Sequence, residues 1–237
     1  MISKRPMQRC VEPEWLDRLR ANDPRAVRSR KDLENINASM NNAAIVQNAL
    51  QDAFGSRPPA RIVEIGAGDG RFALSVARRL ARGWPRVQFL LVDRLDAVRA
   101  ETRAEFAELG WRAEPVQADV FEWLSRPALD SCDACMANLF LHHFSESQLT
   151  DLFRKEAQRA RTFVGVEPRR SARCLFLSRF LWALGCNDVT RHDAPVSVRA
   201  GFNHRELSKL WPADGSWSLA ERAAGPFSHL FVARPRT

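Results

Sequence analysis

A glycine-rich turn within residues 61–70, Arg-Ile-Val-Glu-Ile-Gly-Ala-Gly-Asp-Gly, most constrains how this 237-residue chain can fold. An apolar, β-branched run ends at Ile65. Gly66, Gly68 and Gly70 follow at alternate positions, and an amphipathic helical pattern begins directly afterwards. A strand, a glycine turn and a helix in this order hold a nucleotide-type ligand against a parallel sheet. Glycine allows positive φ in the turn, and its missing Cβ lets the ligand approach the backbone.

Residues beside the turn narrow the choice of ligand. A phosphate-binding loop needs Lys-Ser/Thr after its last glycine, which is missing here, and a dinucleotide site needs a small residue where Arg71 stands. Glu64 would repel a pyrophosphate but suits a ligand that carries positive charge. S-adenosylmethionine has an ammonium and a sulfonium group and no phosphate, so it fits this pattern.

The run Glu64-x-Gly66-x-Gly68-x-Gly70 resembles the first motif of class I S-adenosylmethionine-dependent methyltransferases, and the likeness extends over about residues 58–237. It implies a doubly wound α/β fold, with a seven-stranded, mostly parallel sheet and an antiparallel last strand. It also implies S-adenosylmethionine as the cofactor. The residues expected to bind that cofactor are Glu64, Gly66, Ala67, Gly68, Asp93, Arg94, Asp119, Val120, Asn138 and Leu139.

Two of these residues are acids that end predicted strands. Asp93 follows the apolar run 87–92, at the position where a carboxylate binds ribose hydroxyls in doubly wound nucleotide folds. The resemblance implies the same role for Asp93, and contact with the adenine amino group for Asp119. The alternative for Asp93 is a helix-start residue, but Asp96 already fills that position.

Further apolar runs predict the rest of the sheet. The run 87–92 is continuous and apolar, as is typical of a parallel strand covered on both faces. Residues 132–138 and 162–166 are predicted to be the fourth and fifth strands, which complete five β–α units. Residues 217–224 and 229–233 are predicted to form an antiparallel final pair. Pro115 places its strand near an edge of the sheet, because proline cannot donate to a central ladder.

The residues before the glycine turn are predicted to form an N-terminal helical cap over 1–57, followed by the cofactor-binding domain at 58–237. Helical periodicity runs from about residue 29 to residue 54, with a break expected near Asn41-Asn42 because asparagine is a poor mid-helix residue. We expect the cap to lie over the cofactor and the substrate. A helical hairpin packed on the sheet without ligand contact is an equal alternative.

His142 and His143 follow the fourth strand and precede a helix opened by the capping box Ser145-x-x-Gln148. They therefore lie at the carboxyl edge of the sheet, where open α/β folds bind ligands. The segment Leu-His-His-Phe resembles the equivalent segment of quinone-biosynthesis and related small-molecule methyltransferases. We predict one histidine as a catalytic base, with His143 favoured because Phe144 disfavours the charged imidazolium. The alternative is that both merely pack or line the pocket.

The C-terminal third contains a strongly apolar predicted helix at 171–184, whose apolar surface is too broad for one stripe. Core packing is the simplest interpretation, and a substrate pocket or a second subunit in a homodimer are the alternatives. Residues 186–202 are predicted to be a polar loop of the kind that forms lids or binding segments. His192 in that loop is a reserve catalytic candidate, and 203–211 is predicted to be a short helix.

The net charge of +8 comes from 36 Lys+Arg against 28 Asp+Glu, but the arginines are dispersed along the chain. We therefore expect no nucleic-acid partner. Five scattered cysteines, no signal-peptide pattern and no apolar run of membrane-spanning length predict a cytoplasmic protein. Cys132 and Cys135 have metal or redox spacing, but no second pair exists and residues three apart in a strand face opposite sides. No metal site is predicted.

Function follows from these motifs and from two further likenesses. The sequence Asn138-Leu-Phe-Leu lacks the Pro-Pro-aromatic run of enzymes that methylate amino groups of nucleic-acid bases. The run Asp32-Leu-Glu-Asn-Ile-Asn37 looks like that of small-molecule methyltransferases found beside bacterial polyketide-synthase genes. We predict O-methylation of an aromatic or polyketide-like small molecule, in natural product biosynthesis. C-methylation of a phenol or quinol, and an RNA-binding protein with a vestigial cofactor site, are the alternatives.

Overall fold

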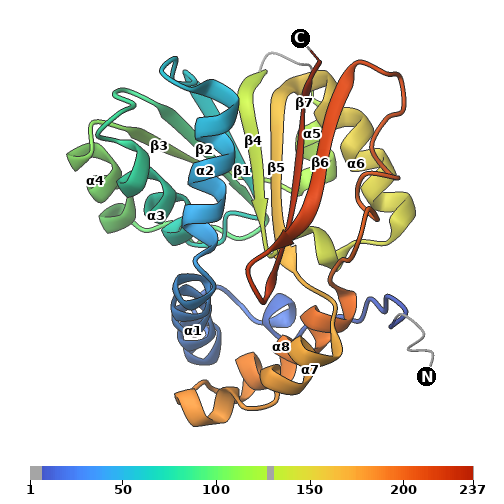
Figure 1. Cartoon of the computed structure of the whole chain (residues 1–237). Helices are drawn as coiled ribbons and strands as arrows, with labels where there is room; N and C mark the ends of the chain where they lie inside the picture. Colours follow the sequence, from blue (N-terminus) through green and yellow to red (C-terminus); the bar gives the residue numbers. More distant parts are fainter. Residues whose placement is uncertain (1–6, 127–130, 237) are drawn as a thin grey trace.

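The central sheet is doubly wound and mostly parallel, as the sequence predicts (Figure 1). The computed structural model describes residues 7–126 and 131–236. Within these residues the sheet has seven strands in the order β3-β2-β1-β4-β5-β7-β6. β7 is antiparallel to both β5 and β6, and the other neighbouring pairs are parallel. The strands are β1 Arg61–Ile65, β2 Gln88–Asp93, β3 Arg112–Gln117, β4 Cys132–Asn138, β5 Ala160–Pro168, β6 Trp217–Ala224 and β7 Ser228–Pro235.

Alternate side chains of the strands build two apolar cores, one on each face of the sheet. In β1, Ile62 packs into one core, whereas Val63 and Ile65 pack into the other. Helices α2 (Asn42–Phe54), α3 (Arg71–Leu80) and α4 (Ala100–Glu108) cover the first face; α5 (Val120–Ser125) and α6 (Glu146–Arg159) cover the second. Strand order reverses between β1 and β4, and ligands bind at such a switch point in open α/β sheets.

A further group of helices lies beyond the carboxyl ends of the parallel strands, in the lower part of Figure 1. It comprises η1 (Leu16–Arg18), α1 (Pro24–Met40), η3 (Leu141–His143), α7 (Ala172–Ser178), η4 (Leu181–Leu184) and α8 (Asp188–Ala200). The break predicted near Asn41-Asn42 is confirmed, because Asn41 has φ 57° between α1 and α2. Helix α2 packs on the sheet, whereas α1 packs against α8. The predicted domain boundary at residue 57 remains a proposal.

Several C-terminal predictions were wrong. The loop expected at 186–202 is helix α8, because the Asn187 side chain accepts the Thr190 N–H at its start and Val189 and Val196 are buried. The helix expected at 203–211 is a series of turns. The single helix expected at 171–184 is divided into α7 and η4.

Other elements agree closely with expectation. Pro115 lies in the edge strand β3, and the capping box of Ser145 with Gln148 opens α6. Asp96, however, does not start a helix, because α4 begins at Ala100 after Arg99. Among the described residues, no helix combines the length and apolar character needed to cross a bilayer.

Candidate active site

A cavity of about 1100 Å³ lies at the carboxyl ends of β1, β2 and β4. The residues predicted to bind the cofactor all line it, as do both candidate histidines. The opposite wall comes from α1, α7 and η4. The cavity is therefore shared between the glycine turn and the helices beyond the sheet.

The glycine turn shapes the floor of this cavity. Gly66, Gly68 and Gly70 have φ of 71°, 55° and 75°, a region that side chains rarely adopt. A Cβ on Gly66 would collide with the ring of Phe140. A Cβ on Gly68 would meet no protein atom within 4 Å, so the turn leaves space there that a ligand can occupy.

Glu64 is the residue at the end of β1 that most clearly calls for a ligand. It is 1% exposed, and its Oε2 atom has no hydrogen-bond partner among the described residues. Burial, with the nearby carboxylates of Asp69 and Asp93, raises the pKa of Glu64 well above its usual range. A cationic ligand would offset the free-energy cost of burying these carboxyl groups close together. The side chains present therefore fit S-adenosylmethionine, which carries an ammonium and a sulfonium group.

The two acids that follow the next strands are oriented by backbone N–H groups. Asp93 accepts from Gly68 N at 2.8 Å and from Leu95 N at 2.9 Å. Asp119 accepts from Phe121 N at 2.8 Å, so it caps α5 as well as facing the cavity. Carboxylate oxygens have further lone pairs. Both acids can therefore accept hydrogen bonds from hydroxyl or amino groups of a bound nucleoside.

An amide network ties α1 and α2 to the end of β4. Asn138 Nδ2 donates to Asn37 Oδ1 at 3.0 Å, and Asn42 Nδ2 donates to Asn138 Oδ1 at 3.1 Å and to Asn37 Oδ1 at 2.8 Å. Asn42 is completely buried. The asparagine-rich stretch that weakens the helix pattern in the sequence thus fixes the junction between α1 and α2 beside the part of the cavity that Asn138 lines.

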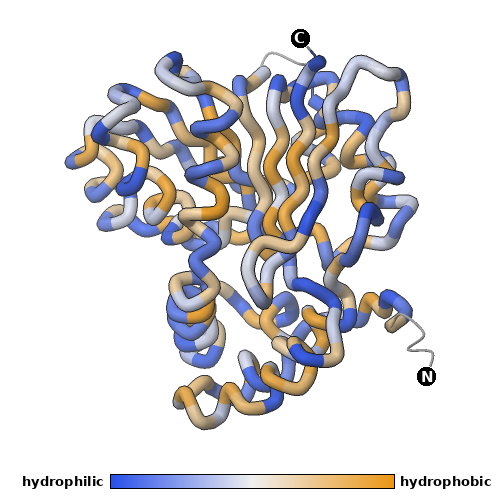
Figure 2. The backbone as a smooth tube through the Cα atoms, viewed as in Figure 1, coloured by the Kyte–Doolittle hydropathy of each residue, from blue (hydrophilic) through white to orange (hydrophobic). Residues whose placement is uncertain are grey.

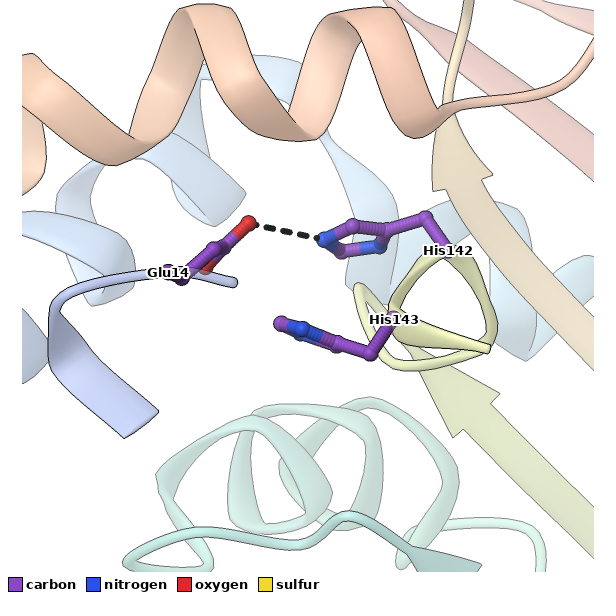
Figure 3. A group of neighbouring side chains, drawn as sticks. All are labelled: Glu14, His142 and His143. Atoms are coloured by element: carbon purple, nitrogen blue, oxygen red, sulfur yellow. Dashed lines mark hydrogen bonds and ion pairs between the residues drawn. The ribbon is translucent and has the colours of Figure 1, made fainter. Parts of the chain in front are cut away.

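His142 lies between two carboxylates. Its Nδ1 atom is 2.7 Å from Glu167 Oε2. Its Nε2 atom is 3.2 Å from Glu14 Oε1, and Figure 3 shows this contact as a dashed line. Burial alone would lower the pKa of His142, but the hydrogen bonds and charges of Glu14 and Glu167 outweigh it and raise this pKa to about 9. His142 is consequently an imidazolium at neutral pH, with no lone pair for a substrate proton.

His143 has a different environment on the cavity wall. Its Nδ1 atom lies 3.3 Å from Asp17 Oδ2, and its side chain is 22% exposed. Burial raises the pKa of Asp17, but the hydrogen bond and charge of His143 outweigh it, so the net pKa of Asp17 is lowered. Asp17 therefore stays anionic and orients the imidazole of His143, which leaves the other ring nitrogen for a substrate.

A strap of residues 14–17, here called the N-terminal strap, brings both acids to the histidines. Asp193 of α8 accepts from Trp15 N at 2.8 Å and from Leu16 N at 2.9 Å. The Trp15 ring stacks on His192, with ring centroids 3.8 Å apart. The reserve candidate His192 is not among the cavity-lining residues and serves to hold the strap. Sequence reasoning missed Glu14, Asp17 and Glu167, because no local motif marks them.

Glu14, His142 and His143 offer three possible metal ligands within 4.8 Å of one another. The two imidazoles lie nearly face to face, with centroids 4.2 Å apart and planes inclined by 32°. Lone pairs in two such planes do not converge on one point, and both ring nitrogens of His142 already face carboxylates. This arrangement does not favour a metal ion shared by the three side chains. Cys132 and Cys135 are buried free thiols whose pKa values burial raises, which disfavours metal binding or redox use.

Comparison with known proteins agrees with this geometry. The family model described as "Methyltransferase domain" matches residues 62–162. A search of curated protein sequences gave no match. Among solved structures, the plantazolicin methyltransferase BamL, solved with S-adenosylhomocysteine and a triazolic desmethylPZN analogue, has 11% identity and a TM-score of 0.63. The match covers 90% of this chain and 92% of that chain.

Two further structures show the same fold. An O-methyltransferase family protein from Burkholderia thailandensis has 18% identity and a TM-score of 0.56. The match covers 91% of this chain and 61% of that protein. Magnesium protoporphyrin IX methyltransferase from Synechocystis PCC 6803, solved with S-adenosylmethionine, has 13% identity and a TM-score of 0.52, over 84% and 80% of the two chains. A match from Nostoc punctiforme is longer, and this chain spans 55% of it.

The family match and the fold define the class of this protein. Structural likeness at these identities shows the fold alone, whereas the family model identifies the domain. Residues 62–162 match a methyltransferase domain, and the sheet has the fold of class I S-adenosylmethionine-dependent methyltransferases.

Proposed function

We propose that this enzyme methylates a hydroxyl oxygen of an aromatic or polyketide-like small molecule, with His143 as the general base. The sulfonium of S-adenosylmethionine is already a good leaving group, so the protein must mainly hold the nucleophile in line with the methyl group. The methyl–sulfur bond breaks as the methyl–oxygen bond forms, and the hydroxyl proton moves to His143. Asp17 then faces the imidazolium that results and stabilises it.

The observation that carries this proposal is the 3.3 Å contact of His143 Nδ1 with Asp17 Oδ2 on the cavity wall. A phenol has a pKa of about 10, so it is mostly protonated at neutral pH and gains from a base. His142 cannot serve in the same way, because carboxylates face both of its nitrogens. The two histidines thus divide the roles, with His142 as the fixed cation and His143 as the base.

The opposite wall supports an apolar acceptor. It includes Leu33 and Ile36 of α1, Leu177 of α7 and Leu181 of η4, and the ring centroid of Phe140 lies 6.4 Å from that of His143. A cavity of about 1100 Å³ has room for the donor and for an acceptor of several rings. The porphyrin and azole compounds named for the related structures are likewise ring systems, which supports a role in natural product biosynthesis.

The test is a methyl-transfer assay with labelled S-adenosylmethionine and a panel of phenols and polyketide-type aromatics, with product structures determined by mass spectrometry and NMR. We expect an O-methyl product, formed at least ~100-fold more slowly by His143→Ala. His204→Ala is the matched control, because His204 is exposed and outside the cavity lining. A C-methyl product would favour C-methylation of a phenol or quinol. Full activity of His143→Ala would show that His143 is not the general base.

Cellular setting and partners belong to the same proposal. All five cysteines are free thiols, which is consistent with the reducing cytoplasm, where we place the enzyme. We expect a small-molecule substrate and no nucleic-acid partner. Submicromolar binding of transfer or ribosomal RNA that weakens steeply with salt would instead favour the RNA-binding alternative.

A further inference from the structure

An apolar arm projects from the enzyme beside the cavity. We call residues 172–184, comprising α7 and η4, the α7–η4 arm. It lies at the end of the molecule away from the sheet, and Figure 2 shows apolar residues along it. Its exposed large side chains are Phe176 (59%), Leu177 (37%), Phe180 (44%), Trp182 (60%) and Leu184 (75%). Scattered exposed apolar residues are ordinary, but a contiguous group on one arm marks an interaction surface.

The charge of the arm indicates what it contacts. Arg173 and Arg179 are exposed, and neither forms an ion pair within the described ranges 7–126 and 131–236. The sequence from 168 to 187 contains four arginines and no acid. Aromatic and aliphatic side chains with flanking arginines are the composition of segments that lie in the interface of anionic membranes.

A second copy of the chain would fit this surface poorly. In a two-fold dimer the same patch meets itself, so the arginines of the two arms would approach one another. The arm supplies no acid to neutralise them, and the next acid in the sequence, Asp188, is 4.0 Å from Arg25. An anionic bilayer surface offers charge complementarity and an apolar layer for the exposed rings.

The inner side of the arm is a wall of the cavity. Cys174, Leu177 and Leu181 line the cavity, whereas Phe176 and Trp182 do not. Phe180 and Leu184 are both exposed and cavity-lining, so the apolar surface of the arm continues into the cavity. We propose that the α7–η4 arm docks the enzyme on an anionic lipid bilayer, so that the cavity opens where apolar acceptors accumulate. This docking is independent of the methylated atom and of the base.

The test is flotation of the full chain with vesicles of phosphatidylcholine alone and of phosphatidylcholine with phosphatidylglycerol. We expect the chain to float with the anionic vesicles, and binding to weaken as salt is added. The double variant Phe176→Ser/Trp182→Ser should reduce the partition coefficient at least ~tenfold, because two rings no longer enter the interface. Arg173→Gln/Arg179→Gln should reduce it by roughly tenfold or more on anionic vesicles only.

Matched controls separate the arm from general surface effects. Arg112→Gln/Arg161→Gln removes the same charge from two exposed residues at the starts of β3 and β5, far from the cavity edge, and should leave flotation unchanged. Thermal unfolding and donor titration of each variant verify that fold and cofactor site are intact. The proposal is overturned if the unmodified chain does not float, if the arm variants float equally well, or if sedimentation shows a dimer that Phe176→Ser/Trp182→Ser dissociates.

Discussion

Asp17 Oδ2 lies 3.3 Å from Nδ1 of His143, and this contact joins the N-terminal strap to the turn that follows β4. The strap reaches this position because Asp193 of α8 holds two of its N–H groups. The proposed base is therefore completed by residues from the N-terminal strap and from α8, outside the region that matches the family model.

The first prediction concerns the strap. Asp17→Asn removes the charge that orients His143 and should lower kcat about tenfold, whereas His143→Ala should lower it at least ~100-fold. Donor affinity should be the same in both variants, because neither residue belongs to the glycine turn. An acceptor whose hydroxyl is already ionised at neutral pH should react at nearly the wild-type rate in both variants, because it needs no base. A loss of kcat in Asp17→Asn that persists with such an acceptor would indicate that Asp17 only supports the fold.

The second prediction concerns the glycine turn. Gly68→Val should abolish binding of S-adenosylhomocysteine in calorimetry, because a side chain there needs unfavourable φ and enters the open space of the cavity. Gly83→Ala is the control, because Gly83 lacks a positive φ and its added Cβ meets only Leu80 O at 3.9 Å. A folded Gly68→Val protein that binds with unchanged affinity would contradict the assignment of the cofactor site.

The third prediction concerns the ribose contact. Asp93→Ala removes a charge-assisted acceptor worth on the order of 1.5–3 kcal/mol, so donor binding should weaken roughly ten- to hundredfold. Asp93→Asn should lose less, because one oxygen can still accept from Gly68 N. The exposed Asp96 does not line the cavity, and Asp96→Ala should bind normally. A change below about twofold in Asp93→Ala would place the ribose contact elsewhere.

The fourth prediction concerns stability against pH. The pKa of His142 is raised to about 9 in the folded chain, against an ordinary value of 6.5. Its protonation therefore stabilises the fold fully below about pH 6.5, and this contribution is lost as pH rises through about 9. The free energy of unfolding should fall over that window by on the order of 3 kcal/mol.

The variant His142→Gln supplies the comparison for this prediction. It should be less stable at neutral pH, because Glu14 and Glu167 lose their shared cation, and its stability should change much less between pH 6.5 and 9. Urea unfolding at several pH values measures both effects. Equal pH dependence in the two proteins would mean that another group titrates in this window.

Much of the sheet and of the donor side could be predicted from the sequence. Strand β2 is a continuous apolar run before Asp93, and the glycine turn needs backbone freedom that only glycine provides at low cost. Asp93 and Asp119 follow strands, so their place at one edge of the sheet follows from parallel order. These signals are local, because each depends on residues within one turn or one strand.

Helix α8 and the N-terminal strap were decided by tertiary contacts. The segment of α8 reads as a polar loop, because it contains Pro195 and several charged residues, but burial of Val189 and Val196 makes it a helix. Asp193 appears in the sequence beside His192, whereas its partners are backbone groups of Trp15 and Leu16. No periodicity or motif connects such distant residues.

The sequence by itself determined the doubly wound sheet, the glycine turn at its carboxyl edge and the presence of two histidines near that edge. Only the tertiary structure distinguished those histidines, because their difference comes from the carboxylates around them. Glu14 and Glu167 hold His142 as a cation, and Asp17 leaves His143 with one free ring nitrogen. The physical reason is that a pKa depends on burial and on nearby charge, and both are set by residues that the chain brings together only when it folds.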